Sequence, residues 1–147
     1  MYNSIITGTG YYVPENIVTN DDLSKLMDTS DAWIQERTGI QQRCFATRGK
    51  DTTTSMGVRA AQMAMEKAKI SKEDIDFLIF ATLSPDYYFP GCGVLAQREL
   101  GLNTVGALDI RNQCSGFIYA LSVADQFIKT GTVSYTHLRA HETVLDL

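Results

Sequence analysis

The chain has 147 residues, of which 44% are hydrophobic and 20% charged, and its formal net charge at pH 7 is −4. This length and composition are typical of a soluble globular domain, and the negative charge argues against nucleic acid as a partner. No apolar run reaches the roughly 20 residues of a membrane span, and the first residues lack a basic signal-peptide start, so we expect a cytoplasmic protein that binds no membrane.

The amino-terminal residues predict a strand. Residues 4–9 form a short, partly apolar run, and Gly8 and Gly10 follow at its end. Val13 stands where a phosphate-binding loop would have its third glycine. We therefore interpret the two glycines as a bend or as a site of close backbone packing.

Two short helices are expected next. The polar residues at 19–22 can cap a helix that ends near residue 27. Residues 29–31 can cap a second helix, which Gly39 would end. The stretch 41–48 is polar and basic, and we expect an exposed connector there.

The chain from there to residue 131 alternates helix and strand. Apolar spacing and turn residues predict helices over 52–70, 93–100 and 115–129 and strands over 75–82 and 104–110. An aromatic loop, residues 84–90, follows the first of these strands. The alternation is typical of an α/β fold in which helices cover a central sheet.

The three cysteines differ in their surroundings. Cys44, Cys92 and Cys114 lie far apart and form no C-x-x-C pair, which argues against a disulfide framework and against a zinc site. Cys114 stands between a predicted strand and a predicted helix. A helix start favours an anion such as a thiolate, and its N–H groups can stabilise an oxyanion. The alternative interpretation is a buried cysteine that acts as a small apolar residue.

The sequence changes character after residue 131. The run 134–143 is polar, and its apolar residues repeat neither every 2 residues, as in a strand, nor every 3.6 residues, as in a helix. It resembles the translated adapter sequence found at the ends of reading frames assembled from fragments. We therefore expect residues 133–147 to be a non-native tail. The only two histidines, His137 and His141, lie in it, and we expect neither to act as a catalytic base or a metal ligand.

Several ordered motifs carry a family resemblance. They are GTGYYVP at 8–14, TNDDL at 19–23, DTSDAWIQERTGI at 28–40, FP at 89–90 and CSGF at 114–117. With these motifs, residues 2–131 resemble the amino-terminal half of β-ketoacyl-acyl-carrier-protein synthase III, a member of the thiolase superfamily.

The resemblance implies an α/β, thiolase-like fold, of which residues 1–132 would form the amino-terminal half: a mixed sheet covered by helices. It implies that Cys114 accepts an acyl group from acyl-CoA, which is a substrate and not a bound cofactor. Malonyl-acyl-carrier protein then loses CO2 and attacks the acyl-cysteine, a decarboxylative Claisen condensation that initiates fatty-acid synthesis. The family also implies a homodimer, with acyl-carrier protein as a partner.

The resemblance assigns four further residues. Trp33 and Arg37 match positions that hold CoA, and Thr29 is expected to help position it. Phe89 matches an aromatic residue that reaches the partner subunit's acyl pocket. The alternatives are a core anchor for Trp33, an ordinary surface charge for Arg37, helix capping for Thr29 and loop packing for Phe89.

The chain departs from the family in two respects. Residues 111–113 are Arg-Asn-Gln where many members have small residues. No residue matches the histidine and asparagine that the family uses for condensation, so we expect acylation without condensation. Two other functions stay open: a fragment of a related polyketide, quinolone or hydroxymethylglutaryl-CoA type synthase, and a non-catalytic remnant that only associates with a partner.

Overall fold

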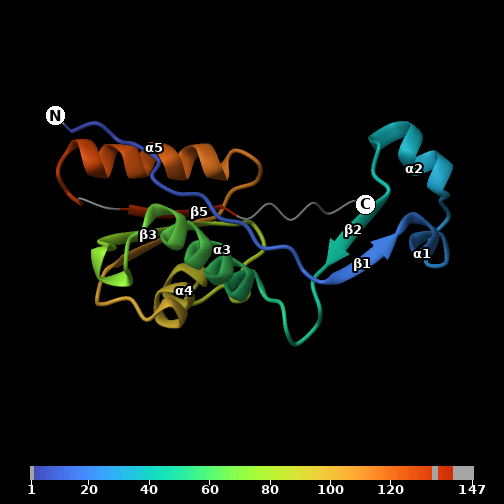
Figure 1. The fold of residues 1–147 in the computed structure, drawn as a ribbon, viewed down its shortest axis with the longest axis horizontal. Coiled ribbons are helices and arrows are strands. Elements are labelled where there is room, and N and C mark those ends of the chain that lie inside the picture. Colours follow the sequence, from blue (N-terminus) through green and yellow to red (C-terminus); the bar gives the residue numbers. More distant parts are fainter. Residues whose placement is uncertain (1, 134–135, 141–147) are drawn as a thin grey trace. The chain divides into compact units, whose positions relative to one another are not determined.

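The computed structural model describes residues 2–133 and 136–140, and the chain divides into two compact units (Figure 1). A large unit combines residues 1–12 with residues 53–147, and a small unit comprises residues 13–52. The predicted alternation of helices and strands lies in the large unit, whereas the two short predicted helices lie in the small one.

The large unit has three layers. Its strands are β3 (Phe77–Ala81), β4 (Gly106–Ile110) and β5 (Thr136–Ala140), in the order β4-β3-β5, with β3 parallel to both neighbours. Its helices are α3 (Thr53–Ala68), α4 (Cys92–Leu100) and α5 (Gly116–Lys129), and a short 3-10 turn, η1 (Lys72–Asp74), precedes β3. Figure 1 shows α5 on one face of this sheet and α3 with α4 on the other. The predicted helices and the two predicted strands after residue 52 are therefore confirmed.

Strand β3 forms the centre of the core. Leu78 and Phe80 pack against α3 and α4, whereas Ile79 and Ala81 pack on the other face against Ala120 of α5. All four β3 residues are at most 3% exposed. A strand covered by helices on both faces needs apolar side chains at every position, which explains why its sequence is a continuous apolar run.

The expected tail contains a strand that the polar sequence did not predict. The five residues of β5 pair in parallel with β3. Backbone groups at a sheet edge can pair without any apolar side-chain pattern. Hydrophobic periodicity in the sequence therefore does not predict such a strand. Residues 134–135 and 141–147 of this segment, with His141, lie outside the described residues. The non-native origin of the segment stays a prediction.

The amino-terminal strand prediction is wrong. Residues 4–9 form no strand in the structure. The segment lies against α3: a Cβ atom added to Gly8 would be 2.3 Å from the carbonyl oxygen of Ala64, and one added to Gly10 would be 2.0 Å from that of Ala60. The interpretation of the glycines as a site of close backbone packing is confirmed. Residues 4–9 therefore follow the surface of helix α3 and do not pair with the edge of a sheet.

We expect Gly10→Ala to destabilise the large unit by about 1–3 kcal/mol, because the added methyl group overlaps the backbone of α3. Chemical denaturation followed by circular dichroism measures the loss. Gly116→Ala is the matched control, since its Cβ atom would lie 3.5 Å from the nearest atom, an ordinary contact. Equal losses in the two variants would contradict the close-packing argument.

The small unit contains two short helices and one strand pair. Its elements are β1 (Asn16–Thr19), α1 (Asn20–Ser24), α2 (Asp31–Thr38) and β2 (Gln42–Phe45), with β1 antiparallel to β2. Both predicted helices are confirmed, and Gly39 ends α2 with a left-handed φ of 72°. The expected connector is corrected to the strand β2. Three of its four side chains are exposed, so no apolar alternation marked it as a strand.

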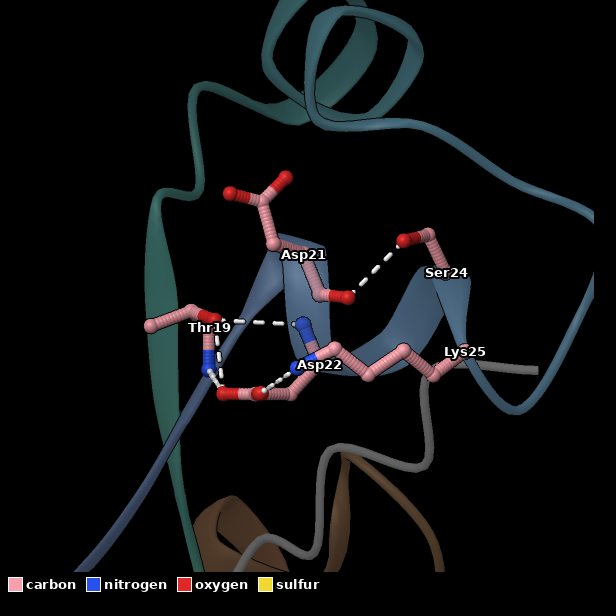
Figure 2. A network of polar contacts seen from close by, with 5 residues as sticks. All are labelled: Thr19, Asp21, Asp22, Ser24 and Lys25. Carbon is pink, nitrogen blue, oxygen red and sulfur yellow. Dashed lines mark hydrogen bonds and ion pairs between the residues drawn. The ribbon is translucent and has the colours of Figure 1, made fainter.

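Figure 2 shows the polar network at the start of α1. The Thr19 hydroxyl oxygen accepts a hydrogen bond from the Asp22 N–H at 3.1 Å, and the Thr19 N–H donates to the Asp22 carboxylate at 3.1 Å. This reciprocal pair is a capping box. The Lys25 ammonium lies 2.7 Å from the other carboxylate oxygen. Lys25 first, and then the Thr19 contacts, hold the pKa of the Asp22 carboxyl well below its usual range.

This network predicts a pH dependence for the small unit. Because the folded-state pKa of Asp22 is lowered, its contribution is complete above the unfolded value of 3.8 and is lost as the pH falls toward the folded value. We expect the melting-temperature difference between the wild type and Asp22→Asn to shrink from about pH 6 to about pH 2. The single tryptophan, Trp33, lies in this unit and reports its unfolding by fluorescence.

The matched control is Asp21→Asn, which removes a carboxylate from the same turn that points away from the network in Figure 2. If the difference in melting temperature between the wild type and Asp22→Asn stays constant across this pH range, the proposed role of the Asp22 carboxylate in the capping box is wrong.

Candidate functional site

Cys114 lies in the turn between β4 and α5. Helix α5 begins two residues further on, at Gly116, and Cys114 is exposed. The Gln113 carbonyl accepts a hydrogen bond from the Gly116 N–H at 2.7 Å, and the Asn112 side-chain oxygen accepts one from the Gln113 N–H at 2.8 Å. These bonds close the turn that holds Cys114 two residues before the helix. The buried-cysteine interpretation of Cys114 is therefore wrong.

The amino termini of the three helices in the large unit differ in what caps them. The Asp86 carboxylate accepts hydrogen bonds from two backbone N–H groups at the start of α3, at 2.7 and 2.8 Å. The Asp109 carboxylate accepts one from Gly93 at the start of α4, at 3.0 Å. The start of α5 has no side-chain cap from Ser115 and no acidic residue in its first turn. The Gly116 N–H already donates to the Gln113 carbonyl, and the N–H groups that follow it in the first turn can stabilise negative charge that develops at Cys114.

The other two cysteines have different environments. Cys92 is fully buried at the start of α4, and burial raises the pKa of its thiol, an effect that contact with the Thr54 hydroxyl partly offsets. Its Sγ atom accepts a hydrogen bond from the Asp86 N–H at 3.4 Å. Cys44 is exposed but lies on β2 and not at a helix start. Of the three, Cys114 alone combines exposure with a helix start, which is the arrangement a nucleophile needs.

Phe89 lies in the aromatic loop, and its side chain is 90% exposed. The base of the loop is fixed to the large unit, because the Thr53 hydroxyl donates to the Ser84 carbonyl at 2.8 Å. At the other end of the loop, a Cβ atom on Gly91 would be 2.8 Å from the Asp109 carboxylate. The loop is thus anchored at both ends while Phe89 projects into solvent, which argues against ordinary loop packing as its role.

In the small unit, α2 presents Trp33 and Arg37 together. The Arg37 guanidinium carbon lies 4.4 Å from the centre of the Trp33 ring, and Trp33 is 52% exposed. The two residues lie at i and i+4 of α2, on one face of the helix, and the core-anchor alternative for Trp33 is wrong. An exposed indole with a stacked guanidinium can contact both an aromatic ring and an anionic group of a ligand.

Thr29 precedes α2 without capping it. The cap is Ser30, whose hydroxyl oxygen accepts a hydrogen bond from the Trp33 N–H at 3.1 Å. Within the described residues the Thr29 hydroxyl oxygen is buried and has no hydrogen-bond partner. The capping alternative for Thr29 is therefore wrong.

The structure thus groups the expected site residues by unit. Trp33, Arg37 and Thr29 belong to the small unit, and Cys114 and Phe89 belong to the large one. Sequence reasoning missed the carboxylates that cap α3 and α4, Asp86 and Asp109. Both residues lie at or just after the end of a predicted buried strand. An acidic residue at that place could have been predicted to cap a neighbouring helix start.

The fold is the amino-terminal half of a thiolase-like fold, as predicted. The solved structure of 3-oxoacyl-[acyl-carrier-protein] synthase III from Aquifex aeolicus VF5 matches 88% of this chain with a TM-score of 0.82 and 48% identity. A priming β-ketosynthase from the R1128 polyketide biosynthetic pathway matches 87% of the chain with a TM-score of 0.82 and 32% identity. Within the described residues the three-stranded sheet is parallel throughout and the antiparallel pair forms a separate sheet, so both kinds of pairing occur, but in two sheets and not in one mixed sheet.

The sequence resemblance is also confirmed. The family described as 3-oxoacyl-[acyl-carrier-protein (ACP)] synthase III matches residues 108–138. The β-ketoacyl-[acyl-carrier-protein] synthase III of Ehrlichia canis is 47% identical over 133 residues, which cover 90% of this chain and 41% of that protein. The chain spans about two fifths of the length of the relatives it matches. Among the described residues no helix is long and apolar enough to cross a membrane.

Proposed function

We propose that this chain provides the amino-terminal part of an acyltransferase of the β-ketoacyl-acyl-carrier-protein synthase III type, and that Cys114 is its acyl-accepting nucleophile. The observation that carries the proposal is the exposed cysteine two residues before α5, in a turn closed by hydrogen bonds to Gln113 and Asn112. Within the part of the chain that the structure describes, carboxylates cap α3 and α4 but not the start of α5.

The proposed first reaction is thioester exchange. The Cys114 thiolate attacks the carbonyl carbon of acyl-CoA, a new C–S bond forms, and negative charge moves to the carbonyl oxygen. N–H groups at the start of α5 would stabilise this oxyanion. The tetrahedral intermediate then collapses, the C–S bond to CoA breaks, and CoA leaves as a thiolate that takes up a proton. Acyl-CoA is a substrate here, and no permanently bound cofactor is needed.

Recognition of CoA is proposed to involve the small unit. The exposed Trp33 ring offers a stacking surface for adenine, and Arg37 at 4.4 Å from that ring offers positive charge for a phosphate. Thr29 is proposed to help position the same ligand, and its hydroxyl has no hydrogen-bond partner within the described residues. Support for these roles comes from the geometry of each group and from the family resemblance.

The complete reaction is proposed to be condensation with malonyl-acyl-carrier protein in the initiation of fatty-acid synthesis. This step needs groups that stabilise the enolate formed on loss of CO2, and no residue of this sequence matches the family's histidine and asparagine. We therefore propose acyl transfer to Cys114 as the activity of the chain by itself. A cytoplasmic homodimer in which Phe89 reaches the partner's acyl pocket is consistent with the 90% exposure of this side chain.

Labelling with acyl-CoA tests the proposal. The chain is incubated with acetyl-CoA, and intact mass spectrometry detects the added acetyl group, which peptide mapping then places. We expect one acetyl group, on Cys114. If acyl-CoA donors of several chain lengths leave Cys114 unmodified while iodoacetamide alkylates it, the proposed function is wrong.

A polyketide priming synthase is the second candidate. The residues Arg-Asn-Gln at 111–113, where many synthase III members have small side chains, favour it. The R1128 priming enzyme is 32% identical to the chain, which is below the 48% identity of the Aquifex aeolicus synthase III. A panel of donors separates the two candidates. Preference for acetyl-CoA supports fatty-acid initiation, whereas preference for a longer or branched donor supports the polyketide alternative.

A further inference from the structure

Arg111 links the end of strand β4 to the aromatic loop. It directly follows the strand and stands three residues before Cys114. Its Nη2 atom donates a hydrogen bond to the backbone carbonyl of Tyr88, and its guanidinium carbon lies 4.9 Å from the centre of the Tyr88 ring. One side chain therefore holds both the backbone and the ring of the residue next to Phe89.

The same strand end contacts the loop at a second point. Asp109 accepts hydrogen bonds from the Gly93 N–H at 3.0 and 3.1 Å, and its carboxylate lies against Gly91. Asp109 thus fixes the carboxyl-terminal end of the loop, and Arg111 fixes its tip. The tip would otherwise have little support, because the side chains of Tyr88 and Phe89 are 80% and 90% exposed.

We propose that Arg111 is a positioning residue that sets which acyl groups Cys114 accepts, by holding the tip of the aromatic loop at a fixed place relative to the cysteine turn. This inference rests on the proposed function, since selection among acyl groups requires acyl transfer to Cys114. The Arg111 contacts are made from the strand that leads into the turn, so the loop and the turn share one anchor. Arg111 would hold the loop in the same way whether Phe89 serves its own subunit or a neighbour, because every copy of the chain carries this contact.

The chemistry of the contact suits arginine in particular. A planar guanidinium can donate to a carbonyl and lie over an aromatic ring at the same time, which a lysine ammonium does less well. A small residue at position 111 could make neither contact. These two contacts with Tyr88 therefore explain why residue 111 is an arginine where many family members have a small residue.

Four variants of the 147-residue chain test the proposal. Arg111→Ala removes both contacts, Arg111→Lys keeps the charge and one donor, and Tyr88→Leu keeps the carbonyl but removes the ring. Arg98→Ala, at an exposed position in the last turn of α4, is the matched control for loss of an arginine. Each variant is assayed for the rates at which acetyl-CoA and octanoyl-CoA acylate Cys114. The rate of alkylation by iodoacetamide is measured in parallel.

We expect Arg111→Ala to shift the ratio of the two acylation rates by at least about threefold toward unity, the size of effect that a displaced apolar contact has on selectivity. Alkylation by iodoacetamide, which needs no acyl recognition, should stay within about twofold of the wild type. Arg111→Lys should recover part of the selectivity, and Arg98→Ala should match the wild type. Hydrogen exchange should be faster in residues 84–91 of Arg111→Ala.

The outcomes separate this inference from the proposed function. If the wild type is acylated and the ratio is unchanged in Arg111→Ala, the role of Arg111 is overturned and the proposed function stands. If acylation and alkylation fall by the same factor, the substitution has altered the thiol itself, and the positioning role is also overturned. If neither donor acylates the wild type, the proposed function fails and the selectivity role fails with it.

Discussion

Cys114→Ser is expected to abolish acyl transfer from acyl-CoA, with a loss of at least about a thousandfold in the rate. Sulfur is intrinsically the stronger nucleophile, whereas a serine hydroxyl needs an adjacent general base to become a nucleophile. Histidine is the usual base in such pairs, and the sequence has histidine only at positions 137 and 141. Time-resolved mass spectrometry of the acylated chain measures the rate.

Cys44→Ser is the control for this prediction, because Cys44 is also exposed but lies on β2 and not at a helix start. We expect it to retain the wild-type rate of acylation. Acyl transfer that survives in Cys114→Ser and disappears in Cys44→Ser would overturn the assignment of the nucleophile.

The helix starts of the large unit explain why a reactive thiol is expected at one of them only. Asp86 at α3 and Asp109 at α4 each place a full negative charge on the unpaired N–H groups of a helix start. A thiolate beside either helix would meet a carboxylate, and the cysteine that does begin α4, Cys92, is buried with its pKa raised by that burial. Within the described residues the start of α5 has no carboxylate partner of this kind, so this helix start can stabilise negative charge that develops at Cys114 during acyl transfer.

Local patterns predicted the parts of the fold that depend on neighbouring residues. Helix α3 follows from its apolar spacing, and α2 follows from the polar cap before Asp31 and from Gly39 after it. The run 75–82 predicted β3 because a strand covered on both faces must be apolar throughout. The same local logic placed Cys114 directly before a helix.

Contacts between distant residues set the features that sequence reasoning missed. Asp86 caps a helix that begins 33 residues before it, and Asp109 binds a residue 16 positions earlier. The strands β2 and β5 form by backbone pairing with strands elsewhere in the chain. Their sequences show no alternation of apolar and polar residues from which a strand could be predicted. Residues 4–9 were misjudged for the converse reason: their apolar residues suggested a sheet, while Gly8 and Gly10 fit a helix surface.

Asn20 is the buried polar centre of the small unit. Its side chain is 1% exposed, and its amide group donates to the Asp31 carboxylate at 2.8 Å and to the Ile40 carbonyl at 2.7 Å. Its oxygen accepts a hydrogen bond from Arg43 at 3.3 Å. Asn20 therefore ties α1 to the first residue of α2, to the chain after α2 and to β2. The pKa of Asp31 is lowered by its hydrogen bond with Gln35 first and by the one with Asn20 second.

We expect Asn20→Ala to destabilise the small unit by about 2–4 kcal/mol, because it removes three partly buried hydrogen bonds and leaves the Ile40 carbonyl without its amide donor. Urea titration followed by the fluorescence of Trp33, which lies on α2, measures the loss. Asn16→Ala is the matched control, since Asn16 is an exposed asparagine of the same unit and should cost less than about 0.5 kcal/mol. Equal losses in the two variants would show that Asn20 has no special role. A loss confined to Asn20→Ala would mean that one buried amide holds in place the helix that carries Trp33 and Arg37.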